Sequence, residues 1–325
     1  MLAAALAVAG CGGDSPKRGG LVAIGAGLRG PAGLKASVYA SGLRTASALA
    51  LDPRGRLWVA TSGATKHNAD AVYLVSRAGA RPVKVIRGVR GPLGLTWSGG
   101  RLYVTSLGRV DAFGGLRGTR FTTHATILVE PAGHGWNNAI VRAPNGRMVM
   151  SISSACDHCA SKTRWSATIV SFRPDGSDVR VYARGIRAGF GLAYYRGELL
   201  VSMNQRDDLG ARTPGDWLAR VRQGDDWGFP RCYGQGGKTC AGVPKPAAVL
   251  DKHAAAGAVT VLGGAALVPE WTYGKVLRVA LTTGATTAKP FLTGLRNPLP
   301  IVTTRAGTIL VGDWGTGRIY RVAPS

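Results

Sequence analysis

One phrase recurs six times along this chain of 325 residues: an apolar run, a turn containing glycine, and a second run rich in β-formers. Alternating apolar and polar residues on both sides of a glycine turn predict a β-hairpin. Such a repeat limits the chain to a few repetitive, antiparallel β-architectures. The copies are SALALDPRGRLWVATSG, PLGLTWSGGRLYVTSLG, NNAIVRAPNGRMVMSIS, GFGLAYYRGELLVSMNQ, GGAALVPEWTYGKVLRVAL and PLPIVTTRAGTILVGDWG, with turn glycines at Gly55, Gly100, Gly146, Gly197, Gly274 and Gly307.

A second pair of candidate strands follows most copies, as in AVYLVSRAGARPVKVIRG and ATIVSFRPDGSDVRVYARG. Four strands in a repeat of roughly 45 residues match a propeller blade, so six copies predict an all-β, six-bladed β-propeller. A β-sandwich or an open β-repeat would also suit glycine-rich hairpins, but six copies without helical periodicity favour the propeller. We expect one domain over residues 33–325, because a closed ring has no independent halves. Residues 204–250 break the pattern and predict a long loop excursion after the fourth blade.

The chain begins with MLAAALAVAG, a short run of small and apolar residues that ends at Cys11. Such a run predicts a lipoprotein signal over residues 1–11, with lipid attached to Cys11. An ordinary signal peptide, or a soluble chain with an apolar start, stays open because no basic residue precedes the run. Residues 12–32 predict a flexible linker. We therefore expect an exported lipoprotein that is held at the cell membrane and faces the extracellular side or the periplasm.

An exported protein meets an oxidising environment, so the four further cysteines predict two disulfides. The shortest pairings join Cys156 to Cys159 and Cys232 to Cys240, although four cysteines allow three connectivities. A zinc site built from Cys156, His158 and Cys159 is the weaker alternative, because no fourth ligand is near in the sequence and an oxidising compartment favours the bridge.

The chain is strongly basic, with 41 Lys and Arg against 17 Asp and Glu and a net charge of +24. A charge of this size raises the question of nucleic acid as a partner. The basic residues are scattered through every segment, without a basic helix or a recognition motif. We therefore expect no nucleic-acid partner, and membrane contact only through the N-terminal lipid.

Three segments carry a resemblance to a known family: VYARGIRAGFGLAYYRGELLVSMNQRDDLGARTPGDWLARVRQGDDWGFPRCYG, GHGWNNAIVRAPNGRMVMSISSACDHCA and RNPLPIVTTRAGTILVGDWGTGRIYRV. Together they resemble the glucose/sorbosone dehydrogenase family, propellers that use pyrroloquinoline quinone (PQQ). The resemblance spans nearly the whole mature chain. It implies a monomer that uses PQQ and calcium to oxidise an aldose sugar by hydride transfer to the quinone, and that passes the electrons to an external acceptor.

The resemblance also implies roles for individual residues. His134 would be the catalytic base that takes the proton from the anomeric hydroxyl, although the family's histidine usually stands at the position of Gly135. Arg187 would face the quinone. The remaining residues are assigned as cofactor contacts, Asn137, Asn138, Lys252 and Arg296, and as calcium ligands, Asp207, Asp208 and Asp216.

One departure from the family bears on function. A Gly-x-Trp-x-Arg loop that often supplies a basic cofactor contact is missing, because KVLRVALTTGATTAKPFLTG runs straight on. The alternative function is therefore a non-enzymatic propeller of the same ancestry, which binds a carbohydrate or a protein and has lost the cofactor.

Overall fold

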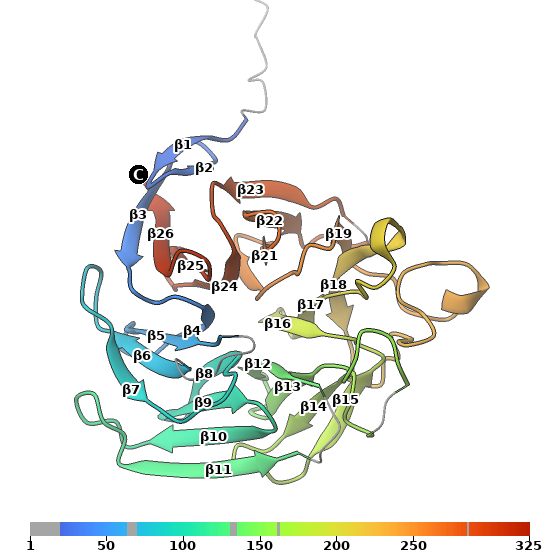
Figure 1. The fold of residues 1–325 in the computed structure, drawn as a ribbon, viewed down its shortest axis with the longest axis horizontal. Coiled ribbons are helices and arrows are strands. Elements are labelled where there is room, and N and C mark those ends of the chain that lie inside the picture. Colours follow the sequence, from blue (N-terminus) through green and yellow to red (C-terminus); the bar gives the residue numbers. More distant parts are fainter. Residues whose placement is uncertain (1–19, 64–69, 131–134, 161–162, 285) are drawn as a thin grey trace, which may run out of the picture.

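Six antiparallel sheets form a ring around a central axis (Figure 1). The computed structural model describes residues 20–63, 70–130, 135–160, 163–284 and 286–325. Each sheet corresponds to one blade and contains the four strands of that blade. The all-β, six-bladed propeller predicted from the repeats is confirmed.

In the first five blades the strand nearest the axis comes first, and the next three follow outward. The first three blades consist of β4 (Ala46–Leu51), β5 (Leu57–Thr61), β6 (Ala71–Val75) and β7 (Val83–Ile86); β8 (Gly94–Ser98), β9 (Arg101–Ser106), β10 (Arg109–Gly114) and β11 (Thr123–Val129); and β12 (Asn137–Arg142), β13 (Met148–Ile152), β14 (Thr168–Phe172) and β15 (Arg180–Arg184). The fourth and fifth consist of β16 (Gly189–Tyr195), β17 (Glu198–Met203), β18 (Gly215–Val221) and β19 (Ala248–Lys252); and β20 (Thr260–Leu262), β21 (Ala265–Glu270), β22 (Lys275–Ala280) and β23 (Lys289–Thr293).

The sixth blade joins the two ends of the described chain. Its inner strands are β24 (Pro298–Thr303), β25 (Ile309–Asp313) and β26 (Arg318–Pro324), and its outermost strand is β3 (Leu34–Ala40). This pairing closes the ring, because β3 precedes the first blade in the sequence. Two more strands, β1 (Val22–Gly25) and β2 (Leu28–Gly30), extend the fifth blade. Residues 20–32, predicted as flexible linker, therefore contain structure.

The fifth copy of the repeat is a different hairpin from the one that the sequence pattern suggested. Gly274 lies in the turn between β21 and β22, whereas the inner hairpin turns at Gly263 and Gly264. The inner strand β20 has only three residues, which is too short to show alternation. This offset and the long loops of the fourth blade together make the spacing of the turn glycines uneven around the fifth copy.

The long excursion lies inside the fourth blade and not after it as predicted, because residues 204–250 also contain β18 and the start of β19. Residues 204–214 connect β17 to β18, and residues 222–247 connect β18 to β19. They contain the short 3₁₀ helices η2 (Gly210–Arg212) and η3 (Lys238–Cys240). Both predicted disulfides are confirmed: Cys156–Cys159 closes a loop between β13 and β14, and Cys232–Cys240 closes part of the second connection.

Neighbouring blades pack face to face through apolar side chains, which strand alternation directs to the sheet faces. Val149, Ile169, Leu199 and Val201, for example, are buried between the third and fourth blades. Truncating one such side chain to alanine costs about 2 to 5 kcal/mol. The ring is therefore a stiff support for the loops at its two ends. Within the residues that the structure describes, no helix is long and apolar enough to cross a membrane.

Candidate functional site

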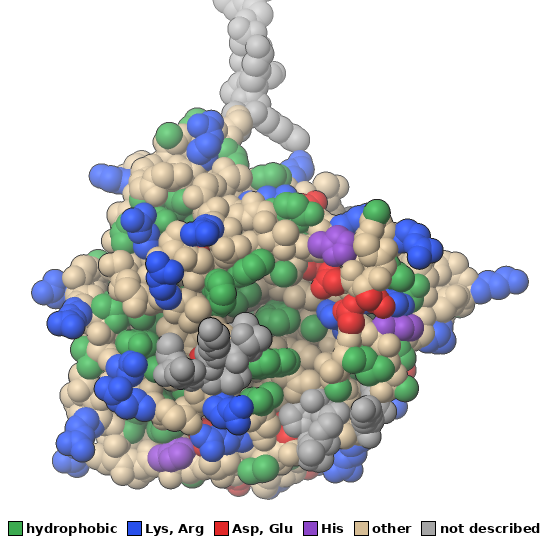
Figure 2. Space-filling model, viewed as in Figure 1, with side chains coloured by type: hydrophobic (Ala, Val, Ile, Leu, Met, Phe, Trp, Pro, Cys, Tyr) green, Lys and Arg blue, Asp and Glu red, His purple; other side chains and the backbone are tan. Residues whose placement is uncertain are grey.

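The innermost strands leave an open channel along the propeller axis. Its volume is 760 Å³, and strands from all six blades line it. Half-buried apolar side chains such as Leu49, Phe190 and Val302 form much of its wall, and Figure 2 shows hydrophobic side chains around the central hollow. The charged side chains in the lining, Asp52 and Arg305, lie where inner strands end. The predicted site residues that the structure describes do not line this cavity; they lie at the opposite rim of the ring, where inner strands begin.

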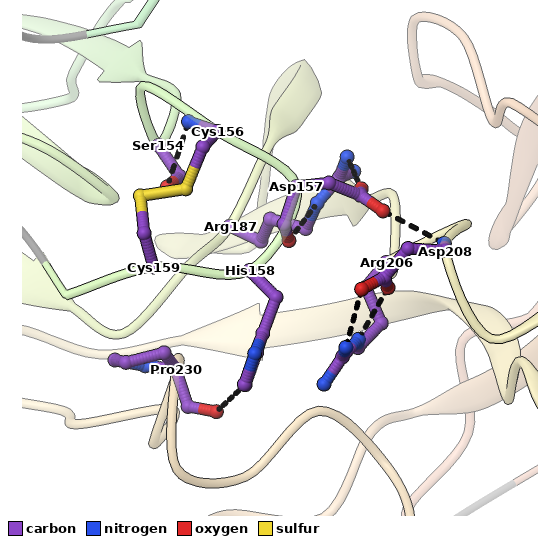
Figure 3. Close-up of a disulfide and its surroundings, with 9 residues drawn as sticks. All are labelled: Ser154, Cys156, Asp157, His158, Cys159, Arg187, Arg206, Asp208 and Pro230. Carbon is purple, nitrogen blue, oxygen red and sulfur yellow. Dashed lines mark hydrogen bonds and ion pairs between the residues drawn. A yellow bond between two sulfur atoms is a disulfide. The ribbon is translucent and has the colours of Figure 1, made fainter.

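Arg187 lies two residues before β16, at the start of an inner strand. Its Nε donates to the carbonyl oxygen of Asp157 at 3.1 Å, and its Nη1 donates to the carbonyl oxygen of Gln205 at 2.8 Å. Its Nη2 forms an ion pair with the Asp157 carboxylate (Figure 3). The guanidinium that the resemblance directs toward a quinone is therefore held by an acid of the same chain.

Asp157 joins three segments of the protein (Figure 3). One carboxylate oxygen contacts Arg187, and the other accepts the backbone N–H groups of Asp207 and Asp208 at 2.9 and 2.8 Å. The residue stands between the two cysteines of the Cys156–Cys159 disulfide. Its loop is fixed further by His158, whose Nε2 donates to the Pro230 carbonyl oxygen at 3.1 Å.

The three acids predicted as calcium ligands have separate partners. Asp207 accepts from His253 Nδ1 at 2.8 Å, and Asp208 accepts from Arg206 Nε at 2.6 Å. Hydrogen bonds from Arg206 lower the pKa of Asp208 to about 2. The buried Asp216 accepts two backbone N–H groups from other loops, and burial raises its pKa to about 6. In the described part of the chain, no cluster of three or more His, Cys, Asp or Glu residues could hold a metal ion.

His253 stands between two acceptors. Nδ1 lies 2.8 Å from Asp207 Oδ1, and Nε2 lies 2.8 Å from the carbonyl oxygen of Gly210. A neutral imidazole carries one N–H, so both bonds form only with the imidazolium. The Gly210 carbonyl and Asp207 accordingly raise the pKa of His253. Figure 2 shows acidic and histidine side chains together beside the hollow, over the loops of the fourth blade.

Asn137 and Asn138 are fully buried between blades. Asn137 Nδ2 donates to the Ser106 carbonyl oxygen at 2.9 Å, and Asn138 Nδ2 donates to Ser153 Oγ at 2.6 Å. Both amides thus hold the strand start in place. A Cβ on Gly135 would lie 2.2 Å from the Ser154 carbonyl oxygen, so the family's usual histidine position has no room for a side chain here. His134 lies outside the described residues, and its role as base stays a prediction.

The two remaining predicted cofactor contacts differ in position. Lys252 ends β19, the outermost strand of its blade, and its Nζ donates to the Ala211 carbonyl oxygen at 3.1 Å. Arg296 is exposed and lies two residues before the inner strand β24, so it stands at the channel end that Arg187 occupies. Cys11, the predicted lipid site, lies outside the described residues.

Aromatic side chains at the same end were missed by the sequence reasoning. Trp271 and Trp314 are half-buried, follow directly after β21 and β25, and form an edge-to-face pair with 5.8 Å between ring centroids. Each follows an acid directly, but the same pattern precedes the buried Trp217 and Trp227, so the sequence did not single these two indoles out. Asp157 was missed as well, and its signal was a charged residue confined between two paired cysteines.

Comparison with known proteins gives matches in structure only. No family model matches the chain, and neither does any curated protein. The PQQ-bound aldose sugar dehydrogenase of Streptomyces coelicolor superimposes with a TM-score of 0.74 at 20% identity, over 90% of this chain and 99% of that one. The PQQ domain of pyranose dehydrogenase from Coprinopsis cinerea, in its holo form, gives 0.76 at 15% identity, over 91% and 96%. The apo soluble aldose sugar dehydrogenase of Escherichia coli gives 0.74 at 14%, over 90% and 100%.

The chain has the propeller fold of the PQQ-dependent sugar dehydrogenases. Whether its residues fit PQQ, a tricarboxylate, is tested best at Arg187. There a guanidinium and two backbone N–H groups surround one carboxylate, which is the donor set that an acid requires. The site thus fits a carboxylate chemically, and Asp157 supplies it in this structure. The predicted calcium ligands do not converge, so we derive no step through a metal ion.

Proposed function

We propose that this protein is an exported sugar dehydrogenase that oxidises an aldose with PQQ. The observation that carries the proposal is the carboxylate site formed by Arg187 and the amides of Asp207 and Asp208. It lies where inner strands begin, in a fold shared with PQQ-bound sugar dehydrogenases. Bound PQQ would supply the redox chemistry by accepting the hydride from the sugar.

The protein's own residues would bind and orient the two reactants. Arg187 would hold one carboxylate of the cofactor, and the exposed Arg296 would supply a second cation at the same channel end. Trp271 and Trp314 would offer aromatic surface to the apolar face of a sugar ring. His134 would take the proton of the anomeric hydroxyl, since an imidazole titrates near neutral pH. An external acceptor would then reoxidise the cofactor.

A second candidate is a propeller that binds a carbohydrate or a protein without any cofactor. The ion pair between Asp157 and Arg187 favours it, because this pair satisfies the cation that a quinone would otherwise neutralise. In that case Trp271, Trp314 and Arg296 would form the binding surface alone.

Titration of the purified protein with PQQ, with and without calcium, separates the two candidates. The first expects a change in quinone absorbance on binding, and reduction of a dye by at least one sugar of an aldose panel. His134→Ala should lower turnover by about 10² to 10⁴ while leaving PQQ binding nearly intact. Calcium is varied because its predicted ligands, Asp207, Asp208 and Asp216, have other partners in the structure. Sugar binding without any PQQ binding would overturn the dehydrogenase and support the second candidate.

A further inference from the structure

We infer that Asp157 occupies a ligand site: Arg187 and the amides of Asp207 and Asp208 form a carboxylate-binding site, and an incoming carboxylate must displace Asp157 to enter it. The inference rests on the proposed function only where it names PQQ as that ligand. The site itself follows from the contacts of Asp157 (Figure 3).

The charged side chains around Arg187 form separate ion pairs. Three acids, Asp157, Asp207 and Asp208, lie among three basic side chains, Arg187, Arg206 and His253. Asp207 pairs with His253, and Asp208 pairs with Arg206. Asp157 is the acid that contacts Arg187 directly, whereas the buried Asp216 acts on this guanidinium only through space. Removing the Asp157 carboxylate leaves a half-buried guanidinium that contacts carbonyl oxygens only, and such a charge favours a replacement anion.

The donors around the Asp157 carboxylate have the geometry of an anion site. The Asp157 carboxylate directs one oxygen to the guanidinium and the other to two successive backbone N–H groups. Successive amides of this kind form a concave anion site whose shape does not depend on which molecule carries the anion. A carboxylate of a ligand can make the same bonds, so exchange conserves both charge and hydrogen bonds.

The pair of Asp157 and Arg187 is accessible from solvent. The Asp157 side chain is 32% exposed and the Arg187 side chain 16%, so the pair is reachable from outside. The loop that carries Asp157 is bounded by a disulfide and fixed by His158, which keeps the internal carboxylate at a high local concentration. A ligand competes with Asp157 for this site. Its apparent affinity is therefore the affinity for the open site multiplied by the fraction of molecules in which Asp157 has left it.

Chemical rescue tests the site without PQQ. Asp157→Ala removes the carboxylate and should lower the midpoint of thermal unfolding. Sodium formate should then raise that midpoint by about 2 to 4 °C beyond sodium chloride of equal ionic strength. The same salts should act alike on the wild type and on Asp175→Ala, a control at an exposed turn. Arg187→Gln in the Asp157→Ala background should abolish the rescue.

PQQ binding provides the second arm. Asp157→Ala and Asp157→Asn should bind PQQ about 10- to 100-fold more tightly than the wild type, because the internal competitor is gone or has lost its charge. Asparagine keeps the side-chain size, so this variant decides the matter if the alanine variant does not fold. Formate rescue without PQQ binding would uphold the carboxylate site and defeat the proposed function. The absence of formate rescue would overturn the inference. Equal PQQ affinity of the wild type and the Asp157 variants would also overturn it, but would leave the proposed function standing.

Discussion

The two sides of the channel opening differ in whether their polar side chains already have partners within the protein. On the fourth-blade side, Asp157, Asp207 and Asp208 are matched with Arg187, Arg206 and His253 in one network. On the side of the fifth and sixth blades, Trp271 and Trp314 present half-buried indoles beside the exposed Arg296. The charged groups of the fourth-blade side are paired with one another, so a ligand must compete with these ion pairs. The indoles and Arg296 on the other side are accessible to a ligand without such competition.

Removing an ion pair on the fourth-blade side should have the largest effect on stability. Arg187→Gln removes an ion pair and leaves Asp157 facing Asp207 and Asp208 without its cation, so the free energy of unfolding should fall by about 2 to 4 kcal/mol. Arg296→Gln, on the other side, should change it by less than about 0.5 kcal/mol, since an exposed cation is removed. Urea unfolding of both variants measures the difference. Equal losses would mean that the two sides do not differ as described.

The sequence predicted the propeller well because every blade repeats the same local rule. Alternation around a glycine turn is visible without any tertiary information, and it failed at the fifth blade, where β20 spans only three residues. The disulfides were also predictable, because Cys156–Cys159 and Cys232–Cys240 are local in the sequence.

The site was less predictable because its contacts join distant segments. Asp157 meets Arg187 across 30 positions and the amide of Asp208 across 51. Family resemblance named Arg187 and Asp207 from their positions, yet it could not reveal that a residue between two cysteines would neutralise the arginine. Asn137 and Asn138 show the opposite case: the resemblance named them as cofactor contacts, whereas their side chains are buried between blades and bond to neighbouring strands.

The aromatic side should matter for the sugar more than for the fold. Trp314→Ala should weaken binding of D-glucose, or of the aldose that reduces the dye fastest, by about 2- to 10-fold, because an aromatic contact contributes about 0.5 to 1.5 kcal/mol. Trp314→Phe should recover part of the loss. Trp97, a half-buried indole that lines the channel near the end of an inner strand, provides the matched control: Trp97→Phe should leave sugar binding unchanged. Isothermal titration of the three variants measures these effects, and equal affinities would remove the aromatic side from the proposed site.

The smallest effect should be a pH dependence confined to the fourth-blade side. The pKa of His253 is raised by the Gly210 carbonyl and Asp207, so the folded state binds this proton more tightly than the unfolded state. The stabilisation is therefore fully present below the ordinary histidine pKa and is lost as pH rises through the raised value.

His253→Gln removes this contribution together with its electrostatic interaction with Asp216. Burial, the largest cause of the raised pKa of Asp216, is common to both proteins. The difference in unfolding free energy between wild type and variant should be larger at about pH 5.5 than at about pH 9. Urea unfolding at the two pH values measures it. A difference that stays constant would show that the imidazolium does not clamp Asp207 and Gly210, and the fourth-blade network would then consist of its two arginine pairs alone.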